Sequence, residues 1–79
     1  MPWRVVELDA KEWGVTMAAE RRAPAAHWKL VLSFRQRDGG TRPVWTEYPL
    51  SATSRASLLQ QAEQIPNERL TAVLADLLR

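Results

Sequence analysis

The chain has 79 residues, a formal net charge of +2 at pH 7 and no cysteine. This length allows one domain, residues 1–79, and the lack of cysteine excludes disulfides, zinc–thiolate sites and a thiol nucleophile. We expect a cytoplasmic protein, because small secreted domains usually depend on disulfides and because no signal peptide or membrane-spanning apolar run is present. Arginine and alanine are abundant, which a GC-rich bacterial genome would explain without any function.

Two segments near the N-terminus, WRVVEL at 3–8 and EWGVTMAAERR at 12–22, alternate between apolar and polar residues. This period of two predicts a pair of β-strands with one apolar face. A tight turn at residues 10–11 would pair Leu8 with Trp13, so that both strands show this face together.

A loop is expected at residues 23–26, where the proline-containing segment APAA interrupts the alternation. The third strand, HWKLVLSFRQR at 27–37, has the clearest alternation, with lysine and arginine on its polar side. Its apolar side consists of Trp28, Leu30, Leu32 and Phe34. The fourth strand, RPVWTEY at 42–48, begins with Pro43, which cannot donate a ladder hydrogen bond and therefore suits an edge strand.

The sequence DGG at 38–40 predicts a hairpin turn between the third and fourth strands. A three-residue loop would set Phe34 opposite Val44 and place Trp45 on the polar face beside Ser33. A two-residue loop at Gly39-Gly40 would instead set Trp45 opposite Phe34 and bury it. The sequence does not choose between these registers.

After Pro49 the apolar period changes from two to that of a helix. Ser51, Thr53 or Ser54 can cap a first helix, which Pro66 closes. Its apolar face contains Leu58, Leu59, Ala62 and Ile65. Asn67 can cap a second helix. The apolar face of this second helix contains Leu70, Val73, Leu74, Leu77 and Leu78.

The order of these elements predicts an α+β fold: a four-stranded antiparallel meander in residues 1–50, followed by two C-terminal helices in residues 51–79. The helices pack on the apolar face of the sheet, where Trp13 and Trp28 belong to the core. The opposite face stays open to water or to a partner.

Catalysis and metal binding are not expected. His27 is the only histidine, no nucleophile motif accompanies it, and the carboxylates have no recognised ligand spacing. Gly39 and Gly40 lie between two strands rather than before a helix, so they predict a turn and not a phosphate loop. We therefore expect neither an enzyme nor a cofactor.

The open sheet face is the candidate binding surface, and its candidate residues are Trp3, Lys29, Arg35, Arg37 and Trp45. Alternation places Trp3 on this face, away from the helices. Exposed tryptophan and arginine are typical of interface hot spots, and open sheet faces of small domains are common sites of association. The sequence therefore favours a small binding or adaptor module whose partner is a protein, or a second copy in a homodimer.

The alternative function is binding of single-stranded nucleic acid through the hairpin at residues 29–45. Single-strand binders combine a cationic groove with aromatic side chains on which bases stack. Glutamates on the same strands oppose this interpretation, because they would repel phosphates or pair with the arginines. The order of four strands and then a helix resembles that of some single-stranded DNA-binding coactivator domains, in topology alone.

Overall fold

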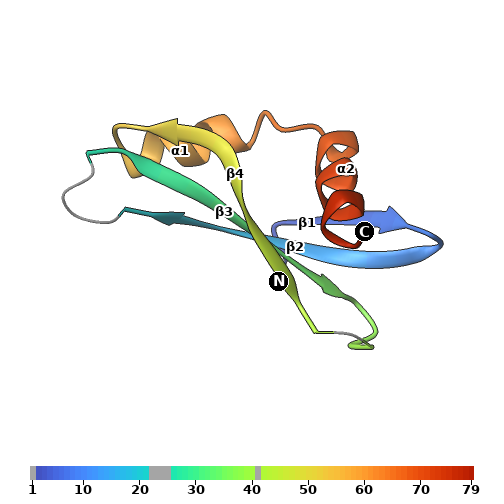
Figure 1. Cartoon of the computed structure of the whole chain (residues 1–79). Helices are drawn as coiled ribbons and strands as arrows, with labels where there is room; N and C mark the ends of the chain where they lie inside the picture. The colour runs from blue at the N-terminus through green and yellow to red at the C-terminus, as the bar shows by residue number, and fades with distance from the viewer. Residues whose placement is uncertain (1, 22–25, 41) are drawn as a thin grey trace.

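The computed structural model describes residues 2–21, 26–40 and 42–79 of the chain. It contains four strands followed by two helices, which confirms the predicted α+β order (Figure 1). The elements are β1 (Arg4–Leu8), β2 (Lys11–Glu20), β3 (Trp28–Gln36), β4 (Val44–Ala52), α1 (Arg55–Ala62) and α2 (Asn67–Leu77). Most of the loop expected at 23–26 lies outside the described residues.

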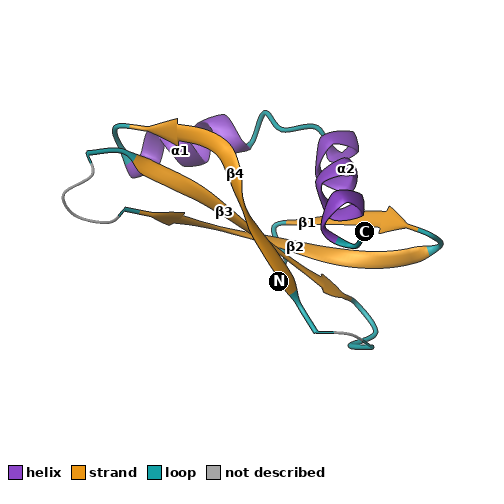
Figure 2. Ribbon diagram, viewed as in Figure 1, coloured by secondary structure: helices purple, strands orange, loops and turns teal. Residues whose placement is uncertain are grey.

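The strands form one antiparallel sheet in the order β1-β2-β3-β4, so that β1 and β4 are its edges. Pro43 directly precedes the edge strand β4, as its missing N–H group requires. The sheet is strongly twisted, and the two helices lie near its opposite ends (Figure 2). Helix α1 packs mainly on β4 and β3, whereas helix α2 packs mainly on β1.

The turn between β1 and β2 differs from the sequence prediction. Asp9 and Ala10 form it, both with positive φ (53° and 64°), and Val6 lies opposite Trp13. The predicted pairing of Leu8 with Trp13 is therefore wrong by two residues, and Leu8 faces Lys11 instead. The apolar face is preserved because a two-residue shift keeps every side chain on its side of the sheet.

The β3–β4 hairpin has the register that the three-residue loop requires. Phe34 lies opposite Val44, and Ser33 lies opposite Trp45. Beyond Tyr48 the register shifts, and β4 continues to Ala52 rather than ending at residue 48. Pro49 stands at this shift and has no N–H group for a regular ladder.

The core fills the space between the sheet and the helices. Seven side chains are buried to less than 2 % exposure: Phe34, Leu30, Leu32, Leu58, Leu70, Leu74 and Val15. Trp13 is also in the core, whereas Trp28 is half-buried at its border, with the Arg21 guanidinium 5.0 Å from its ring centroid. The expected apolar faces of β3 and of both helices thus meet in one cluster, except for Leu59 and Leu78, which do not belong to it.

Some of the residues that cap the helices differ from those expected. Ser54 caps α1, and its hydroxyl oxygen accepts a hydrogen bond from the backbone N–H of Ser57 at 3.1 Å. Helix α1 ends at Ala62, and Pro66 takes the N-cap position of α2. The prediction that Asn67 caps α2 is wrong, because Asn67 is already the first helical residue and its side chain accepts a hydrogen bond from Arg4.

Candidate functional site

The sheet face opposite the helices, hereafter the open face, carries the polar side of β3. Pairing across the strands sets Trp45 of β4 and Thr16 of β2 on either side of Ser33. One step along the sheet, Glu47 and Ala18 lie on either side of Val31. This register decides which of the candidate residues are neighbours.

Trp45 is the most exposed large apolar side chain of the described residues, at 67 %. The strand pattern around it alternates between half-buried and exposed positions, and Trp45 falls on the exposed side. An indole ring left in water forgoes a large burial energy, of order 2 kcal/mol or more for a fully buried aromatic side chain. Trp45 is thus the part of the open face best able to gain from contact with another molecule.

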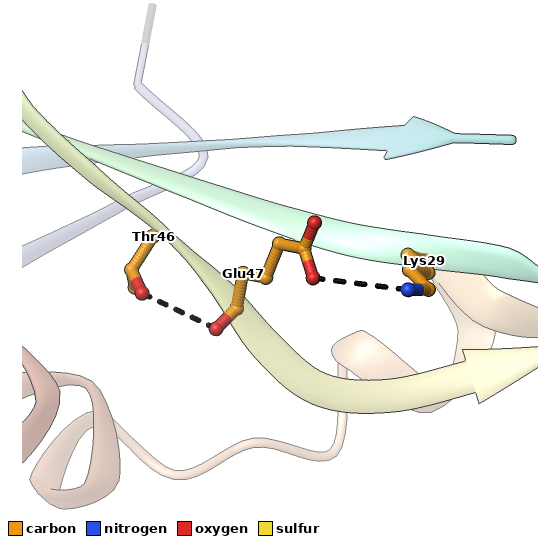
Figure 3. Close-up of polar contacts among 3 residues, drawn as sticks. All are labelled: Lys29, Thr46 and Glu47. Atoms are coloured by element: carbon orange, nitrogen blue, oxygen red, sulfur yellow. Dashed lines mark hydrogen bonds and ion pairs between the residues drawn. The ribbon is translucent and has the colours of Figure 1, made fainter. Parts of the chain in front are cut away.

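Lys29 forms an ion pair with Glu47, with its Nζ atom 4.0 Å from a carboxylate oxygen and both side chains 60 % exposed. The two side chains point toward one another across β3 and β4 (Figure 3). Glu20 of β2 lies opposite Lys29 on its other side. Lys29 therefore belongs to a mixed-charge group and adds little positive potential to the face.

Arg35 and Arg37 line a hollow of about 450 Å³ on the open face. The other lining residues are Pro2, Gly14, Thr16, Ser33, Gln36 and Pro43. No carboxylate is among the residues that line it. The hollow is therefore the most cationic part of the open face.

Trp3 does not lie on the open face, so its predicted position is wrong. Its indole Nε1–H donates a hydrogen bond to a Glu63 carboxylate oxygen at 2.9 Å, and the Arg4 guanidinium stacks 4.4 Å from its ring centroid. Strand β1 begins at Arg4, and the chain bends at Trp3. The alternation of β1 therefore does not extend to Trp3, which packs beside the end of α1.

A second acidic area of the open face lies at the β1–β2 turn. Glu7 and Glu12 lie opposite one another near the β1–β2 turn, and both are exposed. Arg37 meets this group at its edge, where its backbone N–H donates to the carbonyl of Glu12 at 3.0 Å. The open face thus has separate acidic, cationic and aromatic areas rather than one uniform charge.

The structure brings Arg35 and Arg37 together and places Trp45 beside them, while Lys29 lies further along β3 and Trp3 is elsewhere. Sequence analysis placed Ser33 on this surface but missed Thr16 and Gly14. Gly14 inside a strand was a usable signal, because such a glycine often marks the close approach of another group. The hydroxyls could not be paired without the β2–β3 register.

Within residues 2–21, 26–40 and 42–79, no group of three or more histidine, cysteine, aspartate or glutamate side chains could hold a metal ion. Among the same residues, neither helix has the length and apolar character needed to cross a membrane. Comparison of the chain with protein-family models, curated proteins and solved structures finds no match.

Proposed function

We propose that the protein is a small non-enzymatic binding module that associates with a protein through its open face, and that the partner is a second copy of the chain. The observation that carries this proposal is the exposure of Trp45, at 67 %, on a face that no described helix covers. Tryptophan is among the residue types that contribute most to protein interfaces.

The surroundings of Trp45 suit a protein partner. We define the Trp45 patch as Ala18, Lys29, Val31, Trp45 and Glu47. Its apolar centre is bordered by the exposed ion pair between Lys29 and Glu47. An apolar centre with a polar rim is the usual composition of a protein interface.

A second copy suits this patch because the patch carries both charges side by side. In a dimer with two-fold symmetry, residue i contacts residue j of the partner, and j contacts i. Lys29 of one copy can then face Glu47 of the other, and the reverse contact follows from symmetry. A chain of 79 residues also has a small core of its own, so burial of Trp45 by association would add to stability.

Sedimentation equilibrium of the wild-type chain and of Trp45→Ala tests the proposal. We expect a dimer at high micromolar concentration, and a dimer Kd at least about tenfold weaker for Trp45→Ala because the variant loses a central aromatic contact. Leu78→Ala is the matched control, since Leu78 is 46 % exposed at the end of α2 and should leave the Kd unchanged. A monomeric wild-type chain, or a dimer that Trp45→Ala does not weaken, would contradict the proposal.

Single-stranded nucleic acid is a second candidate ligand of the open face. It is favoured by one observation, the β3–β4 register that exposes Trp45 on the same face as Arg35. The displaced Trp3 and the paired Lys29 leave fewer groups for it than the sequence suggested. Retention on single-stranded DNA that falls between low and moderate salt, and that Trp45→Ala weakens, would favour this candidate over the protein partner.

A further inference from the structure

We propose that the hollow beside the Trp45 patch binds the phosphate group of a small phosphate monoester. The hollow and the Trp45 patch share no residue, so separate substitutions can test the two sites. The inference goes beyond the proposed association and does not depend on it.

Several residues that line the hollow carry hydrogen-bond donors that suit phosphate oxygens. Arg35 and Arg37 bring two guanidinium groups, and Thr16 and Ser33, which lie opposite one another in register, bring two hydroxyls. Guanidinium groups form charge-assisted, often bidentate hydrogen bonds with phosphate oxygens. Two guanidinium groups and two hydroxyls in one hollow match the several oxygens of a phosphate better than the two oxygens of a carboxylate.

The two arginines are available for a ligand. Among the residues that the structure describes, the ion pairs are Lys29–Glu47 and Arg79–Asp76, and neither includes Arg35 or Arg37. Both arginines are exposed rather than held against the core. An anion in the hollow would therefore not have to displace a carboxylate from either guanidinium group.

Gly14 allows Pro2 to approach the sheet closely at one side of the hollow. A Cβ atom at this position would come 3.2 Å from the Cβ of Pro2 and 3.8 Å from the backbone oxygen of Arg35. A side chain at position 14 would therefore crowd Pro2, which is part of the lining. The volume of about 450 Å³ exceeds that of a phosphate ion and falls within the range of about 300–1,000 Å³ typical of small-ligand sites, which favours an ester over free phosphate.

Chemical-shift titration of the full-length ¹⁵N-labelled chain tests the site with inorganic phosphate, ribose 5-phosphate and adenosine monophosphate, at constant ionic strength held with sodium chloride. We expect saturable shifts at the amides of Gly14, Thr16, Ser33 and Arg35 with all three compounds. Ribose 5-phosphate should bind more tightly than inorganic phosphate, because its sugar can occupy the part of the hollow that a phosphate ion leaves empty. Still tighter binding of adenosine monophosphate would show that the site also contacts the flat adenine base.

Three variants identify the groups responsible. Arg35→Ala should weaken binding about tenfold or more, as expected for loss of a charge-assisted hydrogen bond, and the near-isosteric Thr16→Val should weaken it severalfold. Arg69→Ala is the matched control: it removes the same charge from an exposed position on α2 and should leave the affinity unchanged.

Three results would overturn the phosphate site. These are shifts that grow linearly and appear equally with chloride, an equal loss of affinity in Arg35→Ala and Arg69→Ala, and binding of single-stranded DNA without any response to the small phosphates. Trp45→Ala should retain phosphate binding even where it abolishes the dimer. Failure of the phosphate site and failure of the proposed association are therefore observed separately.

Discussion

The Arg4 side chain connects the first strand to the turn between the two helices. Its guanidinium group donates hydrogen bonds to the backbone carbonyls of Glu63 and Ile65 and to the side-chain oxygen of Asn67. The carbonyls after the end of a helix have no partner within it, and a planar guanidinium can satisfy several of them at once. One residue at the start of β1 thereby fixes the junction that positions α2.

Removal of this side chain should destabilise the fold. We expect Arg4→Ala to lower the free energy of unfolding by about 1–3 kcal/mol, because it leaves the partly buried carbonyl of Ile65 without its donor and removes two exposed hydrogen bonds. Arg4→Lys should recover only part of this loss, since an ammonium group lacks the forked geometry. Urea denaturation measures both values.

Arg55→Ala is the control for the lost charge, because Arg55 is exposed at the start of α1. Its effect should stay within about 0.5 kcal/mol, as for ordinary surface substitutions. Equal stabilities of Arg4→Ala and Arg55→Ala would show that the hydrogen bonds of Arg4 contribute nothing to the fold.

At the scale of the element, the β1–β2 hairpin contains a local conflict between sequence and backbone. Asp9 and Ala10 both adopt positive φ, as the two central residues of a type I′ hairpin turn must. A residue with a Cβ atom pays about 1–2 kcal/mol for this conformation, and alanine has no polar side chain that could compensate locally.

Glycine at position 10 should therefore stabilise the protein. We expect Ala10→Gly to raise the free energy of unfolding by about 0.5–1 kcal/mol, since relief of the strain exceeds the extra entropy that glycine gives the unfolded chain. Ala56→Gly, within α1, should lower it by about 1 kcal/mol. Thermal denaturation compares the two, and a lower midpoint for Ala10→Gly would refute the strain at this turn.

The strands show what the sequence could predict and where it stopped. Alternation correctly assigned the inward side of β3 and β2, because burial on one side of a sheet imposes a period of two on side-chain polarity. It misplaced Trp3, because the alternation ends where the strand does, and a strand end is not marked by polarity. It did not decide on which side of the sheet Trp45 lies, because register depends on the backbone geometry of the turn rather than on composition.

The candidate site was predictable to the same extent. Arg35 and Arg37 were assigned to the open face from β3 alone, since residues two apart share a side. The hollow between them was not predictable, because it depends on Gly14 and Pro2, which approach from another strand and from the chain start. Contacts of this kind follow from register and from chain bends, which a single sequence does not encode locally.

At the scale of the whole molecule, two short helices cover different parts of one long sheet. Helix α1 packs over the β3–β4 part, and helix α2 packs over β1 and reaches β4. Each helix buries only a few side chains, with Leu70 and Leu74 the fully buried pair of α2. With so few anchors, the attachment of each helix depends on individual residues.

Leu74 is the residue on which the docking of α2 should depend most. It is fully buried within the core cluster, and Leu74→Ala should cost about 2–5 kcal/mol through lost transfer energy and the cavity left behind. A small domain has about 5–15 kcal/mol in total at best, so the thermal midpoint should fall sharply or the chain should fail to fold. Leu78→Ala, on the same helix end but 46 % exposed, should change the midpoint little. If the two variants melt together near the wild-type temperature, α2 does not pack on the sheet through Leu74.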